Sequence, residues 1–554
     1  MPNDESDAIS AFGPDFPFAY DDWLAHPAGL GAVPAEKHGA RVAIIGAGAA
    51  GLVAGYELMR LGLRPVLYES ARLGGRLRSQ RFEGTEGIVA ELGGMRFPVS
   101  SRGFYHYVDL LGLETRPFPN PLTPAAGSTV IDLEGETLYA RTLDDLPPLY
   151  REVAAAYHQA LEDGAQFSAL QAAMRARDAQ RIKAIWDPIV QAWDERTFYD
   201  FVVSSQAFRK LSFRHREVFG QVGFGTGGWD SDFPNSMLEI LRVNLGGFDD
   251  EQRYVVGGVE QVAQGIWRQA PEKLTYWPAG TTLAGLNAGA TRGRAQAIAH
   301  NGKGGFAVMD QWGNRDDYEA VVVTCQSHLL TTSIDAEESL FDQKLWMALD
   351  RTRYMQAAKT FVMVDRPFWK DKDPDTGRDR MSMTLTDRIT RGTYLFDNGD
   401  DRPGVICLSY SWMTDALKVL PLPAERRVEL ALSALSKIYP GLDIAGHIIG
   451  SPICVSWEAD ENFLGAFKGA LPGHYRYNHR MYGHFMQADL PESQRGIFMA
   501  GDGVSWTPAW VEGAVQTALN AVWGVMTHLG GRSPDGNPGP GDLYPALKPV
   551  DLVD

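Results

Sequence analysis

The alternation of apolar and polar positions first becomes regular at residue 41. The run VAIIG predicts a β-strand, LVAGYELMRLG has apolar residues at helical spacing, and PVLYE predicts a second strand. Strand, helix and strand in this order are typical of a βαβ unit, whose two strands run parallel. The sequence therefore predicts that an α/β domain begins near residue 41.

The pattern changes several times further along the chain. Between residues 146 and 215, Ala, Leu and aromatic residues recur every three to four positions and predict helices. Short runs such as EAVVVTC and GVICLSYSW predict strands between 252 and 456, and MAGDGVSWTPAWVEGAVQTALNAVWGVMTHLGG predicts a strand, a loop and a helix. The first forty residues have no such periodicity, so we expect an irregular arm that lies over the folded body.

Length and charge narrow the class of protein. A chain of 554 residues is too long for one hydrophobic core, since cores stop growing near ~250 to 300 residues. Its 52 basic and 69 acidic side chains give a net charge of −17, which disfavours nucleic acid and anionic membranes as partners. The three cysteines are too few and too widely spaced for a disulfide framework or a zinc cluster. The N-terminus lacks the features of a signal peptide, so we expect a cytoplasmic protein.

A glycine-rich loop connects the first predicted strand to its helix. Gly46, Gly48 and Gly51 form G-x-G-x-x-G, followed at the end of the second strand by Glu69. In this context the glycines permit a tight turn, a close approach to a pyrophosphate and close packing of helix on strand. The helix N-terminus at Ala49 and Ala50 attracts the phosphates, and the glutamate accepts hydrogen bonds from a ribose diol. These residues predict a dinucleotide site.

Further glycine and arginine segments suggest which dinucleotide binds. LGGRLRS contains Gly75 and Arg76, ELGGMRFP contains Gly94, Met95 and Arg96, and AGD near the end contains Gly501 and Asp502. With the βαβ unit, these segments resemble the FAD-dependent amine oxidase superfamily, of the tryptophan 2-monooxygenase-like type. Within it the chain looks closest to bacterial L-lysine 2-monooxygenase and L-lysine oxidase.

The resemblance implies a fold, a cofactor and contacts to it. We expect an α/β protein with a Rossmann-like (GR2-type) FAD-binding domain, a mixed-sheet substrate domain and a helical insertion. FAD would also be contacted by Val259 on the adenine side and by Trp510 and Val511 near the isoalloxazine ring. The expected division of the chain is an N-terminal arm (1–40), a first FAD-binding segment with the start of the substrate domain (41–145), a helical substrate region (146–250), a second FAD-binding segment (251–326), a substrate-binding domain (327–490), a third FAD-binding segment (491–531) and a flexible tail (532–554).

The resemblance also implies a substrate site. Arg96 would hold an α-carboxylate, because a guanidinium offers two charge-assisted hydrogen bonds. Lys359 would hold a water near flavin N5 that matters for the reaction with O₂. Trp412, Phe467 and Trp510 would form an apolar wall beside the flavin that expels water. The expected partners are a free amino acid and O₂, and family members are commonly dimers.

Substrate identity rests on a buried counter-charge. A cationic side chain needs a carboxylate in such a pocket, and the lysine-oxidising relatives use the position of Asp232 for it, while Glu458 and Asp460 are weaker alternatives. Arginine, ornithine, phenylalanine and tryptophan remain alternative substrates, and a non-catalytic flavoprotein is an alternative of another class. Phe248 stands where lysine monooxygenases have cysteine, which favours an oxidase that forms H₂O₂ over a monooxygenase that forms an amide and CO₂.

Overall fold

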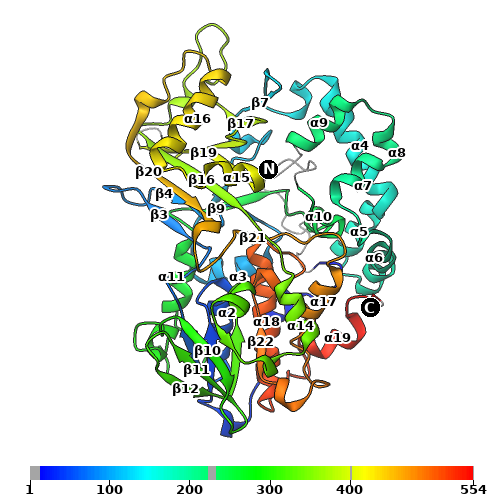
Figure 1. Ribbon diagram of the computed structural model, residues 1–554, viewed down its shortest axis with the longest axis vertical. Coiled ribbons are helices and arrows are strands. Elements are labelled where there is room, and N and C mark those ends of the chain that lie inside the picture. The colour runs from blue at the N-terminus through cyan, green and yellow to red at the C-terminus, as the bar shows by residue number, and fades with distance from the viewer. Residues whose placement is uncertain (1–12, 223–232, 400–401, 553–554) are drawn as a thin grey trace.

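The structure is a computed structural model that describes residues 13–222, 233–399 and 402–552. A parallel sheet and a larger mixed sheet lie in different halves of the molecule (Figure 1). In this view, helix α18 and strand β22 lie in the lower half, and strands β16, β17 and β19 lie in the upper half. The expected combination of an α/β cofactor domain, a mixed-sheet domain and a set of helices is confirmed.

The parallel sheet contains the predicted βαβ unit. Its strand order is β2 (Arg64–Tyr68), β1 (Arg41–Ile45), β13 (Ala320–Val323) and β22 (Ile497–Met499). Helix α2 (Ala49–Arg60) follows β1 directly and packs against the long helix α18 (Val511–His528). The four strands are largely buried, which explains why each was an unbroken apolar run rather than an alternating one. Strands far apart in the sequence therefore meet beside the glycine loop.

An antiparallel sheet lies beside the parallel one at the bottom of Figure 1. Strands β12 (Arg315–Tyr318), β11 (Phe306–Asp310) and β10 (Ala295–His300) pair in antiparallel fashion, and the short β14 (Asp335–Ala336) pairs with β10 in parallel. The side chains that this sheet shares with the parallel sheet form a separate apolar cluster. The antiparallel sheet thus enlarges the half of the molecule that contains the glycine loop.

The mixed sheet has seven strands. Their order is β20 (Ile448–Ser456), β16 (Ala357–Val364), β19 (Gly404–Trp412), β18 (Gly392–Phe396), β17 (Met383–Thr386), β7 (Thr129–Leu133) and β8 (Glu136–Ala140). Strand β16 is buried along its whole length, and it pairs with β19 so that Lys359 lies opposite Tyr410. Near the start of β16, the Lys359 side chain reaches the backbone carbonyl oxygens of Glu91 and Gly93.

The helices predicted after residue 146 cover the right side of the molecule in Figure 1. They are α4 (Pro148–Ala165), α5 (Phe167–Arg175), α6 (Ala179–Trp193), α7 (Phe198–Ser204), α8 (Gln206–Arg209), α9 (Phe213–Val222) and α10 (Met237–Leu245). Helix α10 is buried on nearly every side, and its residues Glu239 and Arg242 are buried charges. It is the helix through which this region reaches the centre of the molecule.

Both ends of the chain differ from expectation. The described part of the N-terminal arm contains helix α1 (Tyr20–Ala25), and Phe16 and Trp23 are core residues rather than a cover. The C-terminal segment, expected to be a flexible tail, forms helix α19 (Pro540–Leu547) with Tyr544 packed against Phe16. Neither segment has strong periodicity, because each contributes a few aromatic side chains to a core made by others.

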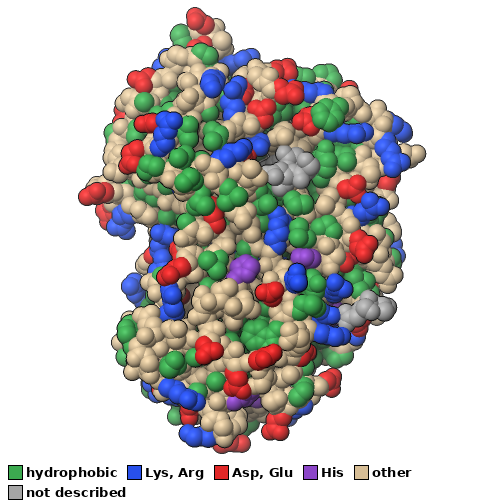
Figure 2. Space-filling view, viewed as in Figure 1, with side chains coloured by type: hydrophobic (Ala, Val, Ile, Leu, Met, Phe, Trp, Pro, Cys, Tyr) green, Lys and Arg blue, Asp and Glu red, His purple; other side chains and the backbone are tan. Residues whose placement is uncertain are grey.

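The surface shown in Figure 2 has acidic and basic side chains interspersed, without a continuous basic stripe on this face. Within the described ranges, no helix combines the length and the apolar character needed to cross a bilayer.

Candidate active site

A large cavity collects most of the residues that the sequence marked. It extends along the glycine loop, the start of α18 and the ends of strands β16 and β19. Of the predicted residues, the following line it: Gly46, Gly48, Ala49, Ala50, Glu69, Gly75, Arg76, Gly94, Met95, Arg96, Lys359, Trp412, Phe467, Gly501, Asp502, Trp510 and Val511. Segments up to 465 residues apart, from 46 to 511, thus share one wall.

The glycine loop is shaped by contacts that exclude side chains. Gly46 has φ +109°, a region that favours glycine, and a Cβ atom there would lie 2.8 Å from Thr324 Oγ1. A Cβ at Gly51 would lie 2.0 Å from the carbonyl oxygen of Gly46. At Gly48, by contrast, the nearest heavy atom would be 3.9 Å away, so open space lies before this residue. The loop therefore leaves room for a ligand at the N-terminus of α2.

Glu69 lies where β2 ends, facing the loop. Its carboxylate accepts hydrogen bonds from the backbone N–H of Ala47 and of Ala71, both at 2.9 Å. Oε1 also accepts from the Arg72 N–H at 3.2 Å and the Ser70 hydroxyl at 3.4 Å, whereas Oε2 has the Ala47 N–H alone and retains a lone pair for a ribose diol.

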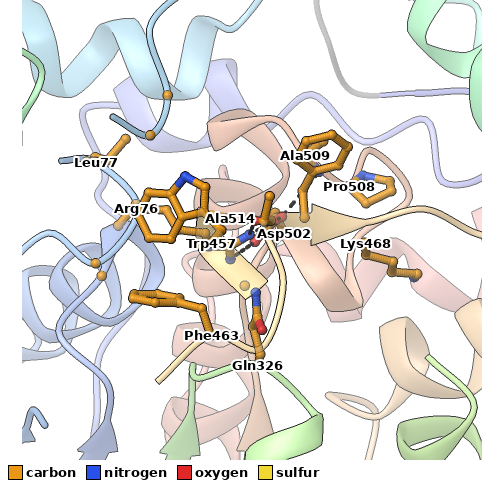
Figure 3. Close-up of a pocket in the computed structure, with 18 of the residues that line it drawn as sticks. Arg76, Leu77, Gln326, Trp457, Phe463, Lys468, Asp502, Pro508, Ala509 and Ala514 are labelled. Carbon is orange, nitrogen blue, oxygen red and sulfur yellow. Dashed lines mark hydrogen bonds and ion pairs between the residues drawn. The ribbon is translucent and has the colours of Figure 1, made fainter. Parts of the chain in front are cut away.

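Arg76 and Asp502 form an ion pair in the cavity wall, with Asp502 buried and Arg76 partly exposed. Arg76 Nη1 lies 3.1 Å from Asp502 Oδ2 and donates a second hydrogen bond, of 2.9 Å, to the Ala466 carbonyl oxygen. Figure 3 shows the two side chains meeting near the centre of the pocket, with Trp457 and Phe463 beside them. This pair connects the GGR segment to the AGD segment, so the two motifs are one structural unit.

Lys359 extends from β16 into the cavity. Its Nζ donates hydrogen bonds to the carbonyl oxygens of Glu91 (3.0 Å) and Gly93 (2.5 Å) and lies 4.7 Å from the centre of the Tyr410 ring. Burial lowers the pKa of Lys359 to about 8, because it disfavours the charged form. The ammonium is thus held in one place by fixed backbone groups and is poised to change charge near neutral pH.

Arg96 lies in the loop before β5 (Phe97–Pro98). The guanidinium lies 5.7 Å from the Phe118 ring and 5.8 Å from the Tyr394 ring, and Nη1 donates to the Tyr394 hydroxyl at 3.3 Å. It is 9% exposed, so a carboxylate that met it would be largely shielded from water.

Aromatic rings form much of the remaining wall. Trp412 packs against Tyr410 at 5.0 Å and against Phe233 at 5.6 Å between ring centres, and Trp510 precedes α18 as its N-cap. Such a wall excludes water and strengthens polar contacts inside.

Four expected residues are not among those that line the cavity, and one of them, Gly51, is buried in the first turn of α2. Val259 is fully buried behind the wall and its N–H donates to Glu91 Oε1 at 2.8 Å, so its contact with the adenine side stays a prediction. Phe248 also lies one layer behind the wall, edge-on to Trp510 at 5.1 Å, and its contact with the substrate stays a prediction. Asp232 lies outside the described residues.

Two charged residues of the cavity wall were not among the candidates chosen from the sequence. Glu239, on α10, and Lys468, on β21 (Phe467–Lys468), are both buried and both line the cavity. A signal existed in each case, since MLEILRV places Glu239 and Arg242 in an otherwise apolar run and GAFKGA places one lysine among small and apolar residues. Glu458 and Asp460, the weaker alternatives to Asp232 as the counter-charge for a cationic substrate, do not line this cavity.

The residues present fit a flavin dinucleotide. The loop offers open space and the N-terminus of α2 for a pyrophosphate, Glu69 offers a carboxylate for the ribose, and the segment from Gly501 to Val511 returns the chain to the same cavity.

Comparisons with known proteins agree with this geometry. Tryptophan 2-monooxygenase of Pseudomonas savastanoi is 30% identical over 92% of this chain and 93% of its own length. An L-amino-acid oxidase of Siganus canaliculatus is 23% identical over 87% of this chain and 85% of its own. The fold is similar to that of putrescine oxidase bound to putrescine, with a TM-score of 0.64 and 19% identity over 88% of this chain and 98% of that one. The model of the family described as flavin containing amine oxidoreductase matches residues 49–526, and the chain therefore belongs to this family, with FAD as its cofactor.

Proposed function

We propose that the protein oxidises a free L-amino acid at Cα, with L-lysine as the preferred substrate. The products would be the 2-oxo acid, ammonia and H₂O₂. The observation that carries this proposal is the convergence of Arg96 and Lys359 with the glycine loop on one cavity. An amino acid oxidase requires a group that binds a carboxylate beside the flavin site, whereas an oxidase of simple amines does not require one.

The chain's own residues would orient the substrate. Arg96 pairs with the α-carboxylate, and the aromatic wall of Trp412 and Trp510 excludes water from the reacting carbon. When bound, FAD supplies the acceptor for the hydride that leaves Cα. Water then hydrolyses the imino acid to the 2-oxo acid and ammonia, and O₂ takes up the two electrons as H₂O₂.

The preference for lysine rests on the sequence resemblance and on a buried acid in the cavity. A cationic side chain is costly to bury without a carboxylate. Asp232 would provide one from outside the described residues, and Glu239 lies on the cavity wall. Arginine and ornithine carry the same charge, while phenylalanine and tryptophan would suit the aromatic wall.

Monooxygenation is the second candidate. The tryptophan 2-monooxygenase relatives, 30% identical over most of the chain, support it. Phe248 supports the oxidase proposal, because a bulky ring packed edge-on behind Trp510 would alter the access of water and O₂ to this part of the site. We infer an oxidase with secondary monooxygenase activity.

A screen and a product analysis test these proposals. Anaerobic mixing with single amino acids should bleach the flavin fastest with L-lysine. Rapid bleaching by phenylalanine and none by lysine would rule out the preferred substrate. With lysine and O₂, the oxidase proposal expects H₂O₂ and oxo acid in excess of amide and CO₂.

The oligomeric state of the protein and its cellular location are also proposed from the family resemblance. Family resemblance supports a homodimer in the cytoplasm, and light scattering of the purified protein should give twice the mass of the 60.9 kDa chain. A monomeric mass at micromolar concentration would contradict it.

A further inference from the structure

Helix α10 and strand β21 contribute a polar corner to the cavity wall. Asn235, Glu239 and Lys468 line it, and their exposures are 3%, 4% and 2%. Polar groups so deeply buried require partners, since an unpaired charge in such a place costs several kcal/mol. The question is which partner each one has.

Glu239 is held in one orientation. Its Oε1 accepts a hydrogen bond from Asn235 Nδ2 at 2.8 Å, and its Oε2 accepts one from the backbone N–H of Ala470 at 2.7 Å. Each carboxylate oxygen retains a further lone pair. Burial raises the pKa of Glu239, and these hydrogen bonds oppose that shift. The carboxylate is thus a preorganised acceptor that is only half used.

Lys468 has no such support. Its Nζ is buried and has no hydrogen-bond partner in the part of the chain that the structure describes. The charged groups that face it are Glu239 and Arg242 from α10 and Asp502 from η10 (Asp502–Val504), with His474 nearby. Burial lowers the pKa of Lys468 to about 8, against the attraction of Glu239. Among the described residues, no hydrogen bond fixes the charge of this lysine.

We propose that Glu239 and Lys468 together form the binding site for the distal ammonium of the substrate, which takes the place of the positive charge on Lys468. The inference rests on the proposed preference for a cationic amino acid. The ammonium would donate to the free lone pairs of Glu239 and to the deprotonated amine of Lys468, which becomes an acceptor.

The exchange keeps the corner neutral. Before binding, the carboxylate and the lysine ammonium sum to zero; after binding, the carboxylate, the neutral amine and the substrate ammonium also sum to zero. Burying a net charge is thereby avoided. The proton of Lys468 leaves to solvent, so binding of a cationic side chain releases about one proton below pH 8 and progressively less above it.

Proton release can be measured on the holoenzyme without turnover. 6-Aminohexanoate has the carboxylate and the distal ammonium of lysine but no α-amine, and hexanoate lacks the ammonium as well. Calorimetric titration at pH 7 in two buffers of different ionisation enthalpy should show close to one proton released for 6-aminohexanoate and none for hexanoate. Equal proton release for the two ligands would overturn the proposal.

Variants locate the effect. In Lys468→Met the proton release should disappear, and in Glu239→Gln the ratio of kcat/KM for lysine over norleucine should fall on the order of 100-fold, mostly through KM. The matched control is Glu458→Gln, a half-buried carboxylate that does not line the cavity, which should leave the ratio unchanged. A ratio that falls equally in Glu239→Gln and Glu458→Gln, or proton release that persists in Lys468→Met, contradicts the proposal.

Failure of the proposed function would look different. A holoenzyme that bleaches with another amino acid and not with lysine would disprove the preference for lysine. Calorimetry with 6-aminohexanoate would still decide whether the corner binds an ammonium, and the flavin absorbance of each variant reports whether it has folded.

Discussion

At the scale of single residues, Arg96 is the group whose loss distinguishes amino acids from amines. The guanidinium between Phe118 and Tyr394 offers charge-assisted hydrogen bonds worth about 1.5–3 kcal/mol to a carboxylate. We expect Arg96→Ala to lower kcat/KM for lysine about 10- to 150-fold. Cadaverine, which lacks the carboxylate, is the control: a loss as large for cadaverine as for lysine would show that Arg96 supports the fold instead.

Lys359 predicts a pH dependence of the reaction with O₂. Its pKa, lowered to about 8 by burial, means that the cation is present below pH 8 and is lost as the pH rises through this value. A cation there stabilises the negative charge that develops on O₂ as it is reduced. Stopped-flow reoxidation should therefore slow as the pH rises through about 8.

In Lys359→Met reoxidation should be slow at every pH, because the cation that assists the reduction of O₂ is gone. Anaerobic reduction by lysine should change far less than reoxidation does. A normal pH profile in this variant would assign the titration to another group.

The glycine loop allows two substitutions to be contrasted. Gly51→Ala drives a methyl into the Gly46 carbonyl oxygen, 2.0 Å away, and should prevent correct folding. Gly48→Ala meets nothing closer than 3.9 Å and its φ of −76° suits alanine, so the protein should fold. The new methyl would nonetheless occupy the space left for the pyrophosphate, and flavin absorbance per chain after purification should drop. Full FAD content in Gly48→Ala would place the pyrophosphate elsewhere.

At the scale of elements, the N-terminal arm and α10 depend on one ion pair. Arg242 Nε lies 2.5 Å from Asp15 Oδ2, the two side chains are 2% and 1% exposed, and Trp186 also donates to Asp15. Asp15→Ala leaves the arginine charge buried without its partner, a defect worth about 3–5 kcal/mol. A lowered midpoint of denaturant unfolding should result.

The control for Asp15 lies in the same arm. Asp22 pairs with Arg177 but is 71% exposed, and exposed pairs contribute about 0–1 kcal/mol. Asp22→Ala should therefore leave the unfolding midpoint almost unchanged. Similar shifts of the unfolding midpoint in the two variants would mean that any substitution in the arm lowers stability, and that the buried ion pair has no special contribution.

Elements also show what the sequence can predict. The βαβ unit was predictable because its signals lie within about thirty residues. The motifs that face the cavity were also predictable, because each is a short run of residues whose chemistry suits a cofactor or a substrate. The depth of Phe248 and Val259 was not predictable, since neither spacing nor composition tells whether a buried residue lies on a wall or one layer behind it. Glu239 and Lys468 line the same cavity although 229 residues separate them in the sequence, a proximity that only the tertiary fold determines.

At the scale of the whole molecule, FAD connects three regions of the chain. The glycine loop, the segment at Gly94 and the start of α18 share the cavity, so a ligand that binds only the native state stabilises all three. FAD at 100 times its Kd should add about 2.7 kcal/mol to the free energy of unfolding. Thermal scans of protein stripped of FAD and then titrated with it should show a rising Tm that follows this logarithmic dependence, whereas a constant Tm would contradict binding at this cavity.

The order of strands in the parallel sheet has a consequence for biosynthesis. Strand β22 ends at Met499, whereas β1, two positions away in the sheet, ends at Ile45. At ~5–20 residues per second, a ribosome needs on the order of half a minute to a minute and a half between the two. Until β22 emerges, when about nine tenths of the chain has been made, the edge of β13 has no neighbour on one side, and an unpaired strand edge of this kind favours aggregation of the nascent chain.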